Sequence, residues 1–506
     1  MKKLVLSLMI IILCTTPISG WAAPPEFSGG INNEYAYEEV IFITGQPIKF
    51  IGTFTVSEKD KGETKTITYK FNKLKPEDKS IDAELTKSIT YVVDYTTRND
   101  KGQTIAQTQI SGKPKETLEI GEDEYELFDY QFSKSDVIDN RPAADFYSGN
   151  MTGRKLYLIN GKKPEDAEGT VTVDITGGNA GYENFWGNTD TQINDYVISS
   201  TRTIAEDDSE DTDEVSWQGT VKVQVSDSMT KNLRYSGNEA NFSSFNGGHI
   251  RVTNREMVSR YDYNLPRFRD GELDGSRRER DSIQLSKQMV PKLERLIVPK
   301  FRDLNGHWAQ ESIEKLYSLD VFDEQSSFFS PNIPFTRGEF TKGIIRACDI
   351  RTTMETEKKT TRRRNEPPEQ SPFQDVAVED QNYQYIKSGL EKQIISGVSP
   401  TAFQPKEPLT RAQAISILIR ALGFENKAPN PGYYTSFADD RSIPNWARDS
   451  IYVAREINLI SGDEMNRVNP NKVVSRAEAA SMLVRFLEFL EKDLQRDYRE
   501  NIIQFN

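Results

Sequence analysis

Between Phe301 and Leu490 one pattern of residues is repeated three times, and this triplication constrains the fold more than any other feature of the sequence. Each copy opens with Phe, any residue and Asp. It closes with a proline followed by a Thr/Ser-Arg-Ala/Gly-Glu/Gln signature, which begins at Thr336, Thr410 or Ser475. The opening Phe and the signature Arg are 36, 38 and 39 residues apart. Such regularity indicates duplication, so we interpret the region as one repeat architecture.

The signature is typical of a capping box, in which Thr or Ser is followed three residues later by Glu or Gln at the start of a helix. The signature arginine therefore falls at the first helical position, where the positive end of the helix dipole disfavours a cation. Two interpretations stay open. The guanidinium and free backbone N–H groups form an anion site, or the arginine makes an ion pair with the Asp that opens a neighbouring copy. The arginines are Arg337, Arg411 and Arg476, and the aspartates are Asp303, Asp375 and Asp439.

The three units resemble S-layer homology repeats. The resemblance rests on the Phe-x-Asp openings, His307-Trp308-Ala309, the Ile-Ser-Gly triplets ending at Gly397 and Gly462, and the arginine signatures, and it covers roughly the last two-fifths of the chain. It implies a mainly α-helical unit of three repeats with pseudo-threefold symmetry. The inter-repeat grooves of that family bind secondary cell-wall polysaccharide, often capped with a pyruvate ketal. The ketal is a carboxylate on a sugar, which would suit the signature arginines.

The resemblance implies a polysaccharide site built from arginines, aspartates, tryptophans and glycines. Each tryptophan lies five residues before the core isoleucine of a first helix, and it either stacks on a sugar ring or packs in the core. Glu324 replaces the glycine in the first copy, and we expect this carboxylate to repel an anionic ligand. The expected binding residues are Arg337, Arg411, Arg476, Asp303, Asp375, Asp439, Trp308, Trp446, Gly397 and Gly462.

The repeats set the expected domain boundaries in the second half of the chain. We place repeat one at 301–350, repeat two at 371–424 and repeat three at 437–490. The charged segment 351–370 is expected to be an exposed inter-repeat loop. Residues 266–300 are charged and contain Pro291, so we expect a linker with a short helix there.

The N-terminus indicates export. Lys2-Lys3, an apolar run and small residues up to Ala22 are typical of a signal peptide at residues 1–22. No second long apolar run follows, so we expect no membrane span in the mature chain. Cys348 is then the single mature cysteine, which excludes an internal disulfide and favours a small core residue. The chain carries 64 basic and 77 acidic residues without a dominant basic stretch, so nucleic acid is not an expected partner.

Residues 24–265 have the period-two alternation and β-rich composition of an all-β domain, either a sandwich or a large antiparallel sheet. Three features leave alternatives open. The acidic run 206–214 either binds calcium or forms a solvated hairpin tip. The segment from Gly177 to Trp186 is either a glycan-binding loop or an ordinary long loop. His249, the single histidine of this domain, has either a structural or a catalytic role.

These patterns together predict a multidomain, secreted, non-catalytic protein at the cell-wall surface. The expected partners are secondary cell-wall polysaccharide and other surface-layer proteins, with no catalytic residue, cofactor or metal. The all-β domain would be displayed as a structural, S-layer-like or interaction module. The alternatives are a wall-anchored enzyme that acts on glycan or peptide through the β domain, and a β module that binds carbohydrate or another protein.

Overall fold

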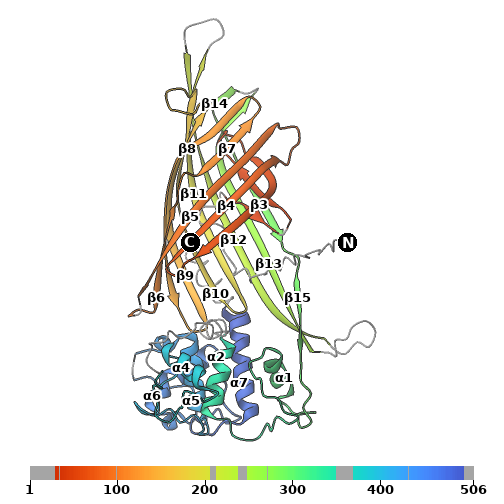
Figure 1. Ribbon diagram of the computed structural model, residues 1–506, viewed down its shortest axis with the longest axis vertical. Coiled ribbons are helices and arrows are strands. Elements are labelled where there is room, and N and C mark those ends of the chain that lie inside the picture. The colour runs from red at the N-terminus through yellow and green to blue at the C-terminus, as the bar shows by residue number, and fades with distance from the viewer. Residues whose placement is uncertain are drawn as a thin grey trace, which may run out of the picture.

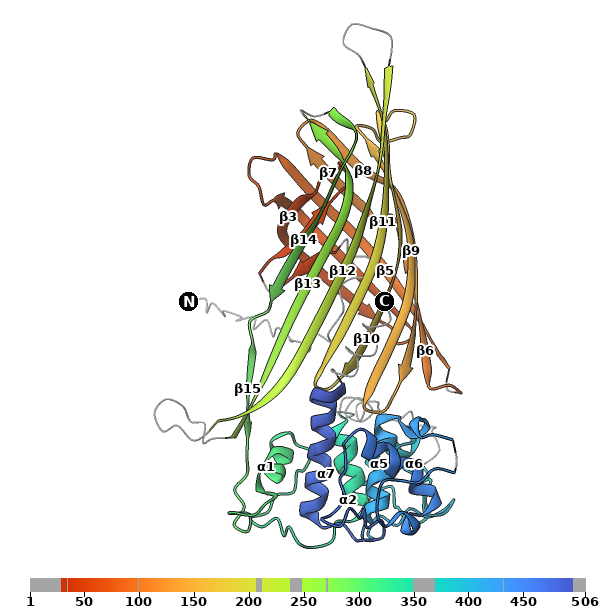
Figure 2. The ribbon, with the colours of Figure 1, turned by 180° about the vertical axis from the view of Figure 1, so that it is seen from behind.

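The computed structural model describes residues 29–494 apart from 34, 99, 206–211, 237–247, 270–271, 349–368 and 431. The expected signal peptide, most of the acidic run 206–214 and nearly all of the 351–370 segment lie outside the described residues. Strands fill the first part of the described chain and helices the second. The strands form a long curved sheet, and the helices pack together against one end of it (Figures 1 and 2).

Fifteen strands in the described part of the chain form one sheet, and every pairing is antiparallel. Strands that follow one another along the chain are neighbours, except that β7 pairs with β5 and β8, and β15 pairs with β13. A large antiparallel sheet is therefore confirmed and the sandwich is not formed. The strands are β1 (Ile31–Asn32), β2 (Tyr37–Ile41), β3 (Ile48–Asp60), β4 (Thr64–Pro76), β5 (Ala83–Arg98), β6 (Gln103–Ile110), β7 (Lys115–Ile120), β8 (Asp123–Asn140), β9 (Ala144–Ile159), β10 (Gly169–Asn184), β11 (Gly187–Ala205), β12 (Thr212–Ser236), β13 (Gly248–Arg269), β14 (Glu272–Gln288) and β15 (Lys292–Ile297).

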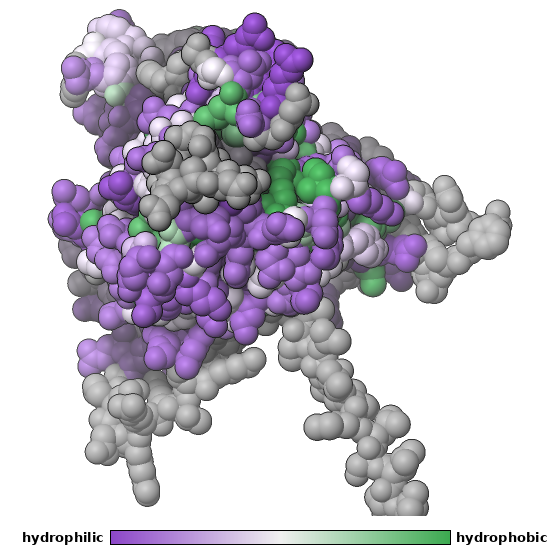
Figure 3. Space-filling model, turned by 90° about the horizontal axis from the view of Figure 1, so that it is seen from above, coloured by the Kyte–Doolittle hydropathy of each residue, from purple (hydrophilic) through white to green (hydrophobic). Residues whose placement is uncertain are grey.

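The sheet curls around its own apolar core. Alternate residues along each strand point to opposite faces, so β10 buries Val171, Val173 and Ile175 while the residues between them face outward. The two ends of the sheet meet across this core. Lys287 of β14 lies 2.5 Å from the carboxylate of Glu38 on β2. Seen from the free end of the sheet, the outer surface is largely hydrophilic, with apolar side chains in a few small areas (Figure 3).

Four charged side chains lie inside that apolar core. Lys87 Nζ is 2.6 Å from Glu39 Oε2 and 3.4 Å from Glu116 Oε1, and Lys155 Nζ is 3.0 Å from Glu116 Oε2. All four residues are at most 5% exposed. Burial alone would raise the pKa of Glu116, but Lys155 and Lys87 hold it at about 2. Burial raises the pKa of Glu39, although Lys87 opposes this shift. The quartet is therefore a fully enclosed cluster of charged residues that ties β2, β5, β7 and β9 together.

The expected linker and short helix at 266–300 are wrong. β13 continues to Arg269, and β14 and β15 both pair with it. Charged residues dominate this segment because it forms edge strands, where charge protects exposed backbone groups from pairing with other chains. Pro291, which lacks an N–H donor, falls in the break between β14 and β15. A cut at residue 265 would thus divide β13 rather than separate two domains.

The Gly177–Trp186 segment is also not a loop. Gly177 and Gly181 lie within β10, paired on both sides, and only residues 185 and 186 turn into β11. The glycines leave room for neighbouring side chains. A Cβ atom at Gly177 would lie 2.1 Å from Asn194 Oδ1, and one at Gly181 would lie 2.3 Å from the Tyr147 ring. Glycine here reflects close packing over the inner face of the sheet.

The helices belong to the three repeats. Repeat one contains α1 and α2, repeat two α4 and α5, and repeat three α6 and α7, so a helix–loop–helix recurs three times. α7 runs on into a short π-helix, η3, at the lower end of the sheet (Figure 2). The helical elements are α1 (Gln310–Ser318), α2 (Arg337–Ala347), α4 (Tyr383–Glu391), α5 (Arg411–Leu422), η1 (Glu425–Lys427), η2 (Asp440–Ser442), α6 (Asn445–Glu456), α7 (Arg476–Glu488) and η3 (Phe489–Asp493).

The sheet and the helices share one hydrophobic core at their junction. Tyr182 and Trp186, at the β10–β11 turn, are buried in the same cluster as the helical repeats. Asn184 donates to the Leu490 carbonyl of η3 at 3.1 Å. His249 of β13 lies 3.3 Å from the Ser318 hydroxyl of α1, and burial lowers the pKa of this imidazole. His249 therefore sits at the junction of the two parts. Cys348, at the end of α2, is buried as predicted.

Candidate functional site: the three inter-repeat contacts

The capping boxes are confirmed at the start of α2, α5 and α7. In each, the hydroxyl of the N-cap residue accepts from the backbone N–H three residues later, and the Glu or Gln there accepts from the N-cap N–H. Each signature arginine is the first residue of its helix. Thr336, Thr410 and Ser475 are therefore the N-caps that position the three guanidinium groups.

The helix N-termini bind backbone carbonyl groups of the next repeat. Arg337 N–H donates to the Glu407 carbonyl at 3.0 Å, and Gly338 N–H donates to the Pro405 carbonyl at 2.8 Å. The same pair of bonds joins repeat two to repeat three and repeat three back to repeat one, which closes a ring. The interpretation that free N–H groups form an anion site is therefore wrong. At the start of each of these helices, the guanidinium group of the arginine is therefore the group that could bind a ligand.

The opening aspartates close the loops of their own repeats. Asp303 accepts from the N–H groups of Phe329 and Ser330, at 2.9 and 2.7 Å. Burial opposes ionisation, yet these donors hold the pKa of Asp303 below its usual range. Asp375 likewise accepts hydrogen bonds from the N–H groups of Phe403 and Gln404, and Asp439 accepts them from the N–H groups of Val468 and Asn469. The Asp–arginine ion pair is not formed, and ligand contact by the aspartates stays a prediction.

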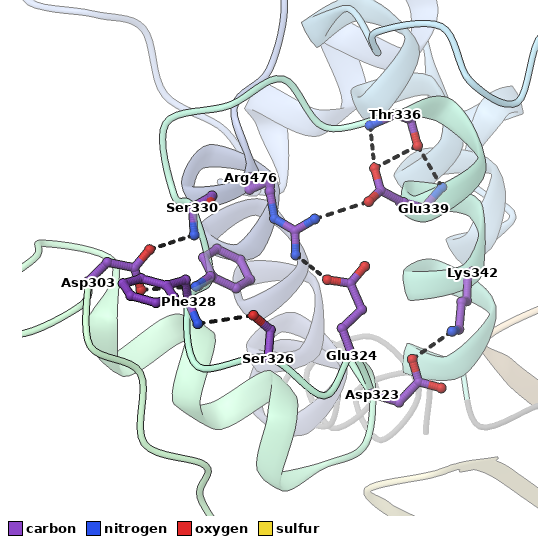
Figure 4. Close-up of polar contacts among 11 residues, drawn as sticks. Asp303, Asp323, Glu324, Ser326, Phe328, Ser330, Thr336, Glu339, Lys342 and Arg476 are labelled. Atoms are coloured by element: carbon purple, nitrogen blue, oxygen red, sulfur yellow. Dashed lines mark hydrogen bonds and ion pairs between the residues drawn. The ribbon is translucent and has the colours of Figure 1, made fainter.

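Arg476 is neutralised within the protein. Its guanidinium reaches from α7 into repeat one, where Nη1 lies 3.0 Å from Glu339 Oε1 and Nη2 lies 2.6 Å from Glu324 Oε2 (Figure 4). It also lies 4.6 Å from the Phe329 ring centroid. We call this contact the third site. Its arginine makes an intramolecular ion pair, but with two glutamates rather than with Asp303.

Arg337 reaches into repeat two in the same way but meets no carboxylate among the described residues. Its Nη2 donates to the Ser396 carbonyl, and the guanidinium lies 4.6 Å from the Phe403 ring centroid. Arg420 donates to the Ser396 hydroxyl at 3.1 Å. Burial, with repulsion from Arg420, lowers the pKa of Arg337 to about 10. This contact, the first site, therefore brings two cations to one serine, and no carboxylate in the described part of the chain bonds to either.

Arg411 reaches into repeat three and forms the second site. Its Nη2 lies 3.3 Å from the Ser461 carbonyl, and no carboxylate of the described residues bonds to it. Burial lowers the pKa of Arg411, while Glu478 at the next capping box opposes that shift. The Glu478 carboxylate is itself 2.6 Å from Lys472. The second site is therefore more nearly charge-balanced than the first, and its arginine is more exposed than Arg337.

The two predicted tryptophans are on the surface. Trp308 is 65% exposed and Trp446 is 57% exposed, so core packing is wrong for both. Gly397 and Gly462 follow the serines that receive the arginines. A Cβ atom at Gly397 would lie 2.2 Å from the Ser399 carbonyl oxygen, and one at Gly462 would lie 2.8 Å from the Asn466 backbone. Both glycines are thus required by close backbone packing beside the first and second sites.

One contributor to the sites was missed in the sequence. The last residue of the capping box in repeat one, Glu339, bonds to the signature arginine that enters this repeat from repeat three, Arg476. Gln413 holds the equivalent position in repeat two, so the first site has an amide where the third has a carboxylate. The difference between Gln413 and Glu339 within the signature could have indicated that these residues contribute to the sites. A capping box accepts both residues, so the difference appeared neutral.

These features define a ring of three helical repeats that exchange an arginine at each contact. Residues 300–341, 372–415 and 436–480 match the model of the S-layer homology domain. The chain therefore carries three S-layer homology domains, as the motifs predicted. Such domains place a protein at the cell-wall surface. No helix in the described residues is long and apolar enough to span a membrane.

Similar proteins include enzymes and a surface-layer protein. The chain is 36% identical over 135 residues to an endoglucanase of Bacillus sp. (strain KSM-635), which is 26% of this chain and 14% of that protein. It is 29% identical over 191 residues to an amylopullulanase of Thermoanaerobacterium thermosulfurigenes, 37% and 9% of the two lengths. It is 26% identical over 192 residues to the surface-layer 125 kDa protein of Lysinibacillus sphaericus, 37% and 15%. The chain thus matches only a small part of each relative.

Proposed function

We propose that the S-layer homology domains hold this protein on an anionic wall polysaccharide, such as one carrying pyruvate ketals, and that the sheet is displayed from this anchor. The observation that carries the proposal is the state of Arg337 and Arg411. Both guanidinium groups are oriented by an N-cap and a carbonyl of the next repeat, and neither bonds to a carboxylate of the described residues. A planar carboxylate on a sugar is the natural partner for such a group.

The repeats that receive Arg411 and Arg337 carry different groups that could bind a ligand. Trp446 lies in repeat three, the repeat that receives Arg411, and its exposed indole can stack on a sugar ring. The first site has Gln381 at the tryptophan position but carries a second cation, Arg420. We therefore propose that the second site binds the sugar and its carboxylate, while the first binds mainly through charge. The opening aspartates hold the loops in place.

We predict that Arg411→Lys weakens binding nearly as much as Arg411→Ala. Lys keeps the charge but cannot make two parallel hydrogen bonds to one carboxylate. A charge-assisted contact is worth about 1.5–3 kcal/mol, so a loss of about tenfold or more is expected at this site. The measurement is a binding isotherm of the full chain on purified wall polysaccharide. Arg154→Lys, which changes an exposed arginine of the sheet that is paired with Asp174, is the matched control.

The role of the ligand carboxylate is tested with the same polysaccharide after mild acid removal of its pyruvate ketals. Affinity of the wild-type chain should fall, and the difference in affinity between the wild type and the Arg411→Lys variant should shrink. Full affinity of Arg411→Lys for the intact polymer would show that a paired guanidinium contact is not used. A large fall in melting temperature for Arg411→Ala would instead indicate a structural arginine.

We further propose that the sheet is not catalytic. The buried carboxylates Glu39 and Glu116 are enclosed with two lysines, out of reach of a substrate. A cavity of about 520 Å³ on β11–β14 is where an enzyme or a carbohydrate-binding module would act, because Asp195, Asp262 and Asp281 line it. We predict no detectable hydrolysis of wall glycan or peptide by the full chain. Turnover that disappears in Asp262→Asn would overturn this proposal.

A further inference from the structure

The third site presents its arginine in the same pose as the first. The guanidinium of Arg476 lies 4.6 Å from the Phe329 ring centroid, and that of Arg337 lies 4.6 Å from the Phe403 ring centroid. Both arginines are 7% exposed. The two sites therefore share the aromatic support and the orientation of the cation. They differ in what the guanidinium binds, which is two carboxylates in the third site and a backbone carbonyl in the first.

A shorter loop explains how a glutamate enters the third site. The N–H of Arg302 donates to the Ser327 carbonyl in repeat one, and the N–H of Gln374 donates to the Thr401 carbonyl in repeat two. Glu324 stands three positions before Ser327, whereas Gly397 stands four positions before Thr401. The loop of repeat one is therefore one residue shorter at this point. The tight backbone turn that excludes a Cβ at Gly397 is thus relieved at Glu324. Its side chain is free to reach Arg476.

The neighbouring cations of the third site are neutralised as well. Asp323 replaces the serine found at Ser396 and Ser461, and its carboxylate is 2.6 Å from Lys342 and 2.8 Å from Arg346. Arg346 stands nine residues after the signature arginine, as Arg420 does in repeat two. In the first site the equivalent arginine bonds only to a serine hydroxyl among the described residues. Repeat one therefore supplies an internal carboxylate for each cation that the first site leaves uncompensated.

We propose that Glu324, with Glu339, occupies from within the chain the place where the other two sites take a ligand carboxylate. The anchor then has two polysaccharide sites and a third, latent one that its own glutamates keep filled. This inference rests on the proposed function, because it uses the carboxylate contact proposed there. It makes Glu324 the residue that sets how many of the three contacts bind polymer.

The test is a gain of binding. In a full chain carrying Arg337→Ala and Arg411→Ala, both open sites are removed. Adding Glu324→Ala and Glu339→Gln removes both carboxylates that bond to Arg476, and Gln413 shows that a glutamine still closes the capping box. Affinity for purified wall polysaccharide should then rise about tenfold or more above the double variant. A further Arg476→Ala should remove that gain. Glu165→Ala with Glu122→Gln changes the net charge equally at exposed positions of the sheet and should restore nothing.

Failure of each proposal gives a different result. Wild-type affinity in the Arg337→Ala, Arg411→Ala chain would overturn the proposed function before Glu324 is tested. Loss of affinity that Glu324→Ala with Glu339→Gln does not restore would overturn only the latent site. A second measurement guards against misfolding of the multiple variant. Glu324→Ala with Glu339→Gln in the otherwise unchanged chain should raise the number of oligosaccharide fragments bound per chain from two to three. An unchanged number contradicts the proposal.

Discussion

Replacing Arg337 and Arg411 together with alanine is expected to lower the affinity of the full chain for wall polysaccharide by about a hundredfold or more. Each arginine contributes a charge-assisted contact of about 1.5–3 kcal/mol, and every 1.4 kcal/mol is tenfold. The two residues lie at different contacts of the ring, so their effects should add. The measurement is a binding isotherm, beside a melting curve for each variant.

Arg476→Ala is the matched control for that experiment. It removes the same residue from the same helical position, but its guanidinium already bonds to Glu324 and Glu339. Affinity should therefore stay within a few-fold of the wild type. If Arg476→Ala weakens binding as much as Arg411→Ala, all three contacts bind polymer and the internal pairing has no effect on it. If neither arginine matters, the polymer binds elsewhere on the anchor.

A second large effect is expected inside the sheet. Glu116→Gln leaves Lys155 without its carboxylate in a fully buried position, and removing one partner of a buried pair costs about 3–5 kcal/mol. The sheet should unfold at a clearly lower temperature or urea concentration. Glu77→Gln breaks the half-exposed contact with Lys49 and is the control, with a cost of about 1 kcal/mol or less. Equal effects of the two changes would contradict the enclosed quartet.

The same carboxylate predicts a dependence on pH. The pKa of Glu116 is held at about 2, below its ordinary value of 4.5. A depressed carboxylate pKa stabilises the folded state above the unfolded value, and this stabilisation is lost as pH falls. The wild-type sheet should therefore lose stability between about pH 4.5 and pH 2. In Glu116→Gln that part of the acid dependence should be missing. The comparison of urea midpoints for the two chains across this range checks it.

The sequence predicted the repeats well because their signals are local. A capping box such as Thr336 to Glu339 acts over four residues, and the proline and Phe-x-Asp signals mark its loop. What the arginines bind was not predictable in the same way. Arg476 meets Glu324 from a repeat 152 residues away, and the N–H groups expected to be free are used by carbonyls of the next repeat. Only closure of the ring brings these groups together.

In the sheet, local composition gave wrong predictions at segments whose structure depends on packing between distant strands. Gly177 and Gly181 indicated a loop, but they serve strands that lie under bulky neighbours. Charge in β14 indicated a linker, although an edge strand tolerates the same residues. Glu116 and Lys155 gave no signal at all, because each is one charged residue among many. Their pairing depends on a strand order that places β7 beside β5 and β8 rather than beside β6, the strand that precedes it in the chain.

The shared core at the junction has a mechanical consequence. Trp186 and Tyr182 of the sheet are buried among the side chains of the anchor, and Asn184 is bonded to η3. A force applied to the sheet is therefore transmitted to the anchor through packed side chains rather than through a flexible linker. Because the sheet is packed against the anchor, binding of the anchor as proposed would fix the direction of the sheet as well.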